Sequence, residues 1–286
     1  MIDLEQLTFG YTKRKRLFDG LDLKIRPGAM CGLLGKNGAG KTSLLRIIAG
    51  LLFPDGGSSR VLGVESEARR PEILGEVYLV PEEFALPEVT VKDFVATRAP
   101  FYPRFDREVL AEALGELEVP DRAGLHTMSY GQRKKFLIAF GMAAGSRVVL
   151  LDEPTNGLDI PSKSQLRKLL IGSLSEERAF VVSTHQVRDL ASILDPIVIL
   201  DRGRILLDVD VETLGRRLTS RIRSDEAAEG EVLWHERVPG GYQVLEENTG
   251  GTSGEIDIEL LFNAVTQQPD RVLPLLAATA HEGGIR

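Results

Sequence analysis

The stretch Gly35-Lys36-Asn37-Gly38-Ala39-Gly40-Lys41-Thr42 decides how the rest of this 286-residue chain is interpreted. It matches the phosphate-binding pattern G-x-x-x-x-G-K-[S/T]. An apolar run at 29–34 precedes it and predicts a buried strand, and residues 41–49 follow it with the apolar spacing of a helix. The glycines let several backbone N–H groups face one centre at the positive end of that helix. The stretch therefore predicts a loop that binds a nucleoside triphosphate.

The polar residues of this loop predict particular contacts. Lys41 would pair with the β- and γ-phosphates, and the Thr42 hydroxyl would ligate Mg²⁺. A chance glycine turn before a helix is the alternative, and the later motifs disfavour it. The residues expected to hold the nucleotide are Gly35, Asn37, Gly38, Ala39, Gly40, Lys41, Thr42 and Ser43.

Two carboxylates end a second buried strand. Residues 148–151 are apolar, and Asp152 and Glu153 follow them directly. Charged groups beside an apolar strand need a reason. Asp152 can hold the Mg²⁺ water shell, while Glu153 can face an attacking water. Two solvated acids at a strand exit are the alternative, which the phosphate loop makes remote.

One histidine stands where active residues gather in parallel sheets. His185 comes directly after a predicted core strand at 180–184. A lone histidine is usually structural, but ligands of such sheets bind outside the carboxyl ends of the strands. His185 is therefore a candidate site residue.

Strands and helices alternate along most of the chain. This alternation predicts a mostly parallel core sheet with helices on both faces. Residues 2–9 and 21–25 predict a small antiparallel sheet before the loop, and residues 197–207 predict a hairpin around 201–203. Residues 85–145 are interpreted as an inserted helical lobe. We expect one α/β domain over residues 1–219.

Residues 220–286 differ in composition and predict a small, acidic, partly flexible extension. From residue 221 on they hold twelve acidic residues against five arginines. Residues 231–234 and 242–245 could form a hairpin across 239–241, and residues 258–266 predict a short helix. The last few residues are expected to be disordered. We find no chemistry in this part of the sequence.

Composition restricts the location and partners of the chain. The net charge is −7, and no region has the basic footprint of a nucleic-acid or anionic-lipid binder. No apolar run approaches the roughly 18 residues that a membrane span needs, and the start of the chain lacks a signal-peptide pattern. Cys31, the single cysteine, is interpreted as a buried apolar side chain rather than a reactive thiol. We expect a cytosolic protein that does not insert into the membrane directly.

The order of these motifs resembles the ATP-binding cassette (ABC) family over residues 1 to about 210. Residues 129–132, Ser-Tyr-Gly-Gln, are similar to the family signature L-S-G-G-Q and lie 87 residues after Thr42. Residues 151–153 resemble its Walker B strand end, 157–159 its D-loop, and His185 its switch histidine. Tyr11 alone is as consistent with a tyrosine plugging a strand end as with base stacking. The resemblance favours stacking on adenine.

The resemblance implies a P-loop NTPase of the ABC-ATPase fold with a composite site. It implies that two cassettes, here a homodimer, sandwich ATP and Mg²⁺ head to tail. Glu153 would act as general base or position water, His185 would contact the γ-phosphate, and Lys41 would stabilise developing charge. The contacts to the ATP of the other cassette would come from Ser129, Gly131, Gln132 and Asp159.

Two residues depart from the family pattern. Glu82 stands where the family usually has a glutamine that touches Mg²⁺ and the membrane subunit. We expect Glu82 to be a metal ligand; the alternatives for a carboxylate at this position are that it binds the metal more strongly than glutamine or that it is displaced from the metal. Tyr130 replaces the first glycine of the signature, so its ring must point away from the nucleotide.

Within the family, the chain most resembles ATPase subunits of ABC-2-type exporters. Residues 101–106 and 259–265 carry this less specific match. The resemblance implies an ATPase on the inner face of the cell membrane, held there by a membrane-spanning permease that contacts the Glu82 loop and residues 85–120. The alternative is a soluble ABC ATPase that acts on the ribosome or on DNA. Ribosome-acting members usually carry two cassettes per chain, and this chain has one. DNA-repair members insert a long coiled coil between the loop and the signature, and the 87 residues here leave no room for it. A non-hydrolysing regulator is a third and weaker alternative.

Overall fold

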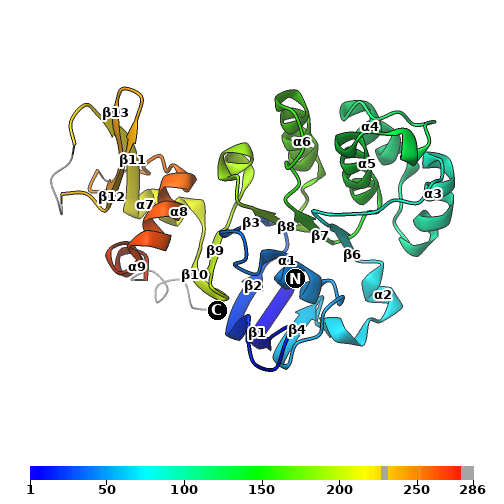
Figure 1. Ribbon diagram of the computed structural model, residues 1–286, viewed down its shortest axis with the longest axis horizontal. Helices are drawn as coiled ribbons and strands as arrows, with labels where there is room; N and C mark the ends of the chain where they lie inside the picture. The colour runs from blue at the N-terminus through cyan, green and yellow to red at the C-terminus, as the bar shows by residue number, and fades with distance from the viewer. Residues whose placement is uncertain (227–230, 251, 278–286) are drawn as a thin grey trace.

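A six-stranded sheet forms the centre of the computed structural model, which describes residues 1–226, 231–250 and 252–277 (Figure 1). The strand order is β10-β9-β3-β8-β7-β6. Every neighbouring pair is parallel except β9 and β10, which form the predicted hairpin. The strands are β3 (Met30–Leu34), β6 (Val77–Val80), β7 (Val148–Asp152), β8 (Ala179–Thr184), β9 (Ile197–Asp201) and β10 (Arg204–Val209).

The register of the three central strands brings the predicted motifs to one edge. Leu34 of β3 pairs with Thr184 of β8, and Asp152 of β7 pairs with Ser183 of β8. The phosphate loop, the two carboxylates and His185 all follow these strands. They therefore meet at the carboxyl edge of the sheet, where ligands of such folds bind.

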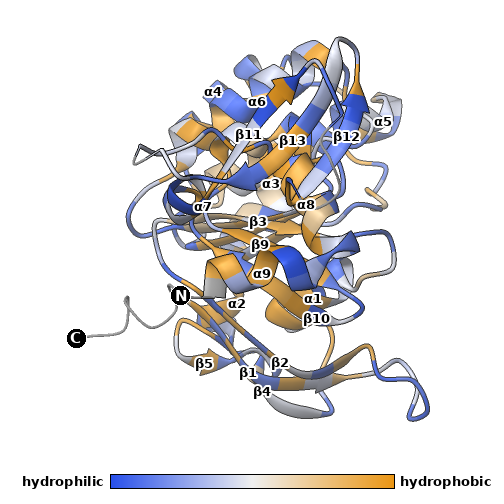
Figure 2. Cartoon of the chain, turned by 90° about the vertical axis from the view of Figure 1, so that its left-hand side faces the viewer, coloured by the Kyte–Doolittle hydropathy of each residue, from blue (hydrophilic) through white to orange (hydrophobic). Residues whose placement is uncertain are grey.

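An antiparallel sheet covers one face of the core, with α1 (Lys41–Ile48) between the two sheets (Figure 2). Its order, β2-β1-β4-β5, contains the two strands predicted before the phosphate loop. Alternate side chains of β3, including Cys31 and Leu33, pack into this layer. Burial raises the pKa of the Cys31 thiol, as expected of a structural cysteine. The strands are β1 (Ile2–Phe9), β2 (Phe18–Ile25), β4 (Gly56–Val61) and β5 (Val64–Glu65).

Helices cover the opposite face of the core sheet (Figure 1). Aromatic rings hold this layer together, because Phe140 of α5 makes ring contacts with Tyr78, Phe94 and Phe105. Helices therefore lie on both faces of the sheet, as the sequence predicts. The helices here are α3 (Val91–Arg98), α4 (Arg107–Glu116), α5 (Tyr130–Ala143) and α6 (Ile160–Ser173), and α2 (Pro71–Leu74) lies before β6.

Among its described residues, the C-terminal part adds a three-stranded sheet of order β11-β13-β12 and three helices. The predicted hairpin is present, although its first strand begins at Trp234 and not at Glu231. Strand β11 and helix α9 were not predicted, and β11 crosses the predicted boundary at 219/220. The end predicted to be disordered lies outside the described residues. The elements are α7 (Val211–Arg217), β11 (Leu218–Arg223), β12 (Trp234–Val238), β13 (Gly241–Glu247), α8 (Ile258–Gln267) and α9 (Pro269–Ala277).

Within the described ranges, every helix is too short or too polar to cross a lipid bilayer.

Candidate functional site

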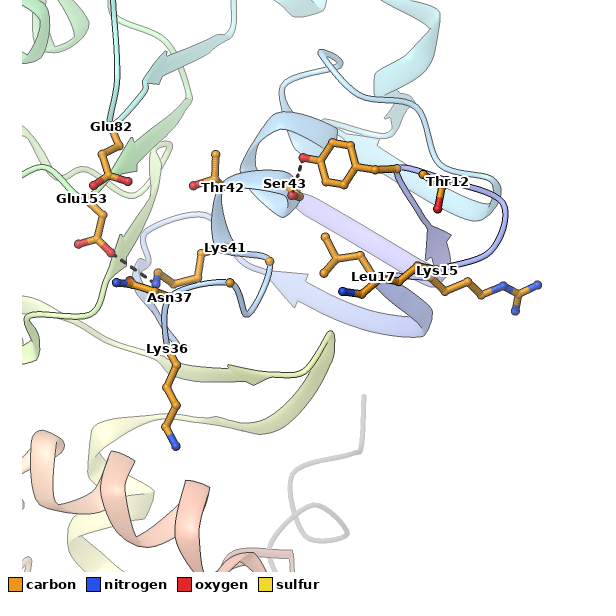
Figure 3. A pocket seen from close by; sticks show the side chains of 14 residues that line it. Thr12, Lys15, Leu17, Lys36, Asn37, Lys41, Thr42, Ser43, Glu82 and Glu153 are labelled. Atoms are coloured by element: carbon orange, nitrogen blue, oxygen red, sulfur yellow. Dashed lines mark hydrogen bonds and ion pairs between the residues drawn. The ribbon is translucent and has the colours of Figure 1, made fainter.

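A pocket of about 480 Å³ opens beside the glycine loop between β3 and α1 (Figure 3). The loop follows a buried strand, and Gly38 and Gly40 take positive φ values of 81° and 111°. Because glycine has no Cβ, it adopts this backbone without strain and lets the loop curl around the pocket. The lining includes Tyr11, Lys15, Leu17, Asn37, Lys41, Thr42, Ser43, Glu82 and Glu153.

Lys41 is buried at the floor of this pocket. Its Nζ donates to the main-chain oxygen of Gly35 at 2.6 Å and lies 3.4 Å from Oε1 of Glu153. A buried ammonium needs such partners to offset its lost hydration. The pair connects the phosphate loop to the second carboxylate motif.

Two of the three predicted metal-binding side chains, Thr42 and Asp152, contact each other. The Thr42 hydroxyl donates to Oδ2 of Asp152 at 2.7 Å, and the Ser183 hydroxyl donates to Oδ1 at 2.5 Å. Hydroxyl and carboxylate oxygens suit a hard cation such as Mg²⁺. No cluster of three or more His, Cys, Asp or Glu side chains suited to a metal exists among the described residues. A cation at Thr42 and Asp152 would need further ligands, and Mg²⁺ commonly takes several of its ligands from water and phosphate.

Glu153 and His185 form a hydrogen-bonded pair. Nδ1 of His185 lies 2.8 Å from Oε1 of Glu153, and the His185 amide donates to Oε2 at 3.3 Å. Glu153 has a φ of 47°, which is unfavourable for a residue with a side chain. Together with Lys41, these contacts aim the Glu153 carboxylate at the pocket.

Glu82 approaches the same pocket from the loop after β6. Its Oε1 accepts from Nδ2 of Asn156 at 3.0 Å. Its carboxylate therefore lines the pocket but already has a protein partner.

The predicted stacking residue Tyr11 lies at the rim of the pocket and is 62% exposed. Its ring meets Phe9 edge-on at 5.1 Å between centroids, and its hydroxyl forms a 2.8 Å hydrogen bond with Ser43. One face of the ring therefore stays open beside the phosphate loop.

The signature residues lie outside this pocket. Ser129 caps α5: its hydroxyl accepts from the Gln132 amide at 3.2 Å, and the Gln132 side chain accepts from the Ser129 amide at 3.0 Å. This reciprocal capping box leaves the N-terminus of α5 as a rigid, positive helix end. Gly131 lies in the first turn of the same helix.

Asp159 also lies away from the pocket. Its carboxylate caps α6 by accepting from the Ser162 amide at 3.0 Å, and hydrogen bonds with Ser162 lower the pKa of Asp159. The structure thus gathers the loop, Asp152, Glu153, His185 and Glu82 at one place. It leaves Ser129, Gly131, Gln132 and Asp159 at another.

Several residues at or near the site were not predicted from the sequence, among them Lys15, Ser183 and Lys134. Lys15 lines the pocket from the basic turn after Tyr11, and only the run of charges at 13–16 signals it. Ser183 supports Asp152, and Lys134 is a fully buried lysine in α5. No sequence pattern marks these last two, because both act through contacts between distant elements.

Solved structures share this fold. An ATP-binding subunit of an ABC transporter matches 76% of this chain and 92% of its own, with a TM-score of 0.68 and 22% identity. The dimeric post-hydrolysis state of an ATP-binding cassette bound to ADP and phosphate matches 73% and 98%, with a TM-score of 0.65 and 22% identity. The fold is thus that of an ABC ATPase cassette.

Sequence comparison defines the family. A family model described as ABC transporter matches residues 18–156. The aliphatic sulfonates import ATP-binding protein SsuB of Ralstonia nicotianae is 33% identical over 71% of this chain and 70% of its own. The ABC transporter ATP-binding protein YtrB of Bacillus subtilis is 28% identical over 75% and 73%. The chain therefore belongs to the family of ABC transporter ATP-binding proteins, whose cassettes hydrolyse ATP.

The names of the relatives indicate different roles, import in one case and drug resistance in another. SsuB is named for import, whereas the daunorubicin/doxorubicin resistance ATP-binding protein DrrA of Streptomyces peucetius is 32% identical over 72% of this chain and 64% of its own. Membership of the family therefore leaves the direction open.

Proposed function

We propose that this chain works as half of a head-to-tail pair of cassettes, which hydrolyses ATP to drive export through a separate membrane-spanning subunit. The observation that carries the proposal is the contact series Lys41–Glu153–His185 at the phosphate pocket, whose lining does not include the signature residues Ser129, Gly131 and Gln132. The phosphate pocket lacks the signature residues, and the signature end of α5 lacks a phosphate-binding loop. A site made from two chains follows.

The pocket side would bind the nucleotide and activate water. Tyr11 stacks on adenine, the loop amides and Lys41 hold the phosphates, and Glu153 orients the attacking water while His185 meets the γ-phosphate. Thr42, Asp152 and the nearby Glu82 would hold Mg²⁺, which neutralises charge on the phosphates when bound.

The signature side would complete the site on the partner's ATP. The capped N-terminus of α5 presents Ser129 and the Gly131 amide to an anion, with Gln132 fixing the cap and Asp159 in the adjoining turn. Phosphoryl transfer depends chiefly on positioning and charge neutralisation. Closing two chains on ATP supplies both.

A surface groove supports docking of a permease. It measures about 1190 Å³ and lies where the core meets the helical lobe, with Phe101 68% exposed on its wall. Arg46, Arg69 and Arg98 also line it, against the single acid Glu83. An apolar segment that carries carboxylates would fit this groove. Docking would hold the protein at the cytoplasmic face of the membrane.

The export direction rests on the stretches 101–106 and 259–265 and on the likeness to DrrA. Residues 220–286 are proposed to form an extension of the cassette, and an ion pair between Arg188 and Glu259 joins this extension to the segment after His185.

Affinity purification from detergent-solubilised membranes tests the assignment. We expect the wild-type chain to recover a protein with several membrane spans, identified by mass spectrometry, and Phe101→Asp to lose it. Ile222→Asp is the matched control, because Ile222 is an exposed apolar residue on β11, remote from the groove. Recovery of ribosomes without a membrane protein would contradict the proposal.

A further inference from the structure

Tyr130 joins the signature helix to the Glu82 loop. It is the first residue of α5, and its hydroxyl donates to the main-chain oxygen of Glu82 at 2.6 Å. Its ring stacks on Phe84 with 5.1 Å between centroids and 18° between planes. A glycine at this position, as in the family signature, could make neither contact.

The same ring also contacts the turn after Glu153. A Cβ added to Gly157 would lie 3.0 Å from the Tyr130 ring, so this glycine lets the turn approach the tyrosine. Gly157 has a φ of 78°, which glycine adopts without strain. Tyr130 thus lies between the loop that carries Glu82 and the turn that leads to Asp159.

Lys134 makes a second connection one helical turn further along α5. It is fully buried, and its Nζ donates to the main-chain oxygens of Glu153 at 2.5 Å and Asn156 at 3.2 Å. The ammonium lies 5.8 Å from the centre of the Tyr130 ring. The Asn156 side chain donates to Glu82, so both Tyr130 and the turn after Glu153 are bonded to the Glu82 loop.

The cost of this arrangement points to a role beyond stability. A buried ammonium loses its hydration, and burial lowers the pKa of Lys134. The ammonium is held against a residue, Glu153, whose own backbone conformation is unfavourable. The buried ammonium and the unfavourable backbone of Glu153 both cost free energy. Such features are expected at sites where the position of a functional group must be fixed.

We propose that Tyr130 and Lys134 are positioning residues for ATP hydrolysis. They fix the signature helix to the Glu82 loop and to the turn after Glu153, so that the Glu153 carboxylate stays aimed at the phosphate pocket. Neither side chain lines that pocket, so we expect both to act on turnover and to leave the affinity for ADP nearly unchanged. The proposal rests on the role proposed above for Glu153.

Tyr130→Phe tests it, because this change removes one hydroxyl and keeps the ring stacking. We expect kcat for ATP to fall by about fivefold, the value of one hydrogen bond. The affinity for ADP, measured by titration calorimetry, should stay within about twofold. Lys134→Met should lower kcat by at least about tenfold, since it removes two hydrogen bonds from an ammonium, again with unchanged ADP affinity.

Tyr78→Phe is the matched control. The Tyr78 hydroxyl donates to the main-chain oxygen of Leu137 at 3.1 Å, so this variant loses a similar bond to the same helix but none to the Glu82 loop. Its kcat should match the wild type. Full kcat in Tyr130→Phe, or an equal loss in Tyr78→Phe, would overturn the proposal. An inactive wild-type chain would instead refute the proposed function, so the two failures are distinguishable.

Discussion

Glu153 is the residue on which the most contacts in the site converge. Its carboxylate meets Lys41 and His185, and its main-chain oxygen accepts from Lys134. A left-handed backbone at a non-glycine residue costs about 1–3 kcal/mol and persists only where the surroundings enforce it. The contacts around Glu153 supply that enforcement.

Lys41→Ala removes the ammonium from the floor of the pocket. We expect ATP turnover to be abolished, because the substitution deletes the cation for the phosphates and one of the two partners of the Glu153 carboxylate. Phosphate release from purified protein measures this. Unchanged turnover would refute the location of the site. Lys36→Ala is the control, since Lys36 lies in the same loop without an ion pair to Glu153.

Ser129→Asp separates the two roles of Ser129. Aspartate caps helices as well as serine, so thermal stability should change little, whereas Ser129→Ala should lose about 1 kcal/mol. A carboxylate facing the γ-phosphate of the partner's ATP should nevertheless stop turnover. Wild-type turnover in Ser129→Asp would show that α5 does not meet the nucleotide.

Among the elements, α5 connects the core sheet to the helical lobe. Its first turn carries the signature, its middle carries Lys134, and Phe140 lies at the centre of the aromatic cluster. The helix is buried along most of its length, so its N-terminus is placed by packing.

The space around two helical glycines, Gly141 in α5 and Gly115 in α4, predicts that alanine substitutions will have opposite effects on stability. A Cβ on Gly141 would lie 2.5 Å from the Tyr78 ring, so Gly141→Ala should destabilise the fold by about 1–3 kcal/mol. Gly115 in α4 has no atom within 4 Å of the same position. Gly115→Ala should therefore stabilise the protein by roughly 0.5 kcal/mol. Urea unfolding of both variants checks the prediction, and equal midpoints would contradict this packing.

Short sequence patterns predicted those elements and motifs whose residue types are distinctive within a few positions. The glycine loop, the acids after β7 and the histidine after β8 are each recognisable within a few residues. Strand β11 was missed because its residues show no alternation of buried and exposed side chains, and only pairing with β13 reveals it. The Lys134 contacts join positions about twenty residues apart across two elements. Tertiary packing alone brings them together.

At the scale of the whole molecule, we propose that one chain holds two unlike halves of a site. The pocket lies beside the glycine loop, and the capped end of α5 lies outside it. Ile160, beside Asp159 at the start of α6, is 84% exposed.

The mass of Glu153→Gln in solution with saturating ATP and Mg²⁺ tests whether two chains pair around the nucleotide. Glutamine keeps the shape of the side chain but cannot activate water, so ATP should persist and hold two chains together. Light scattering should then give twice the mass of one chain, and the mass of a single chain when ADP replaces ATP. A single-chain mass with ATP would contradict the account.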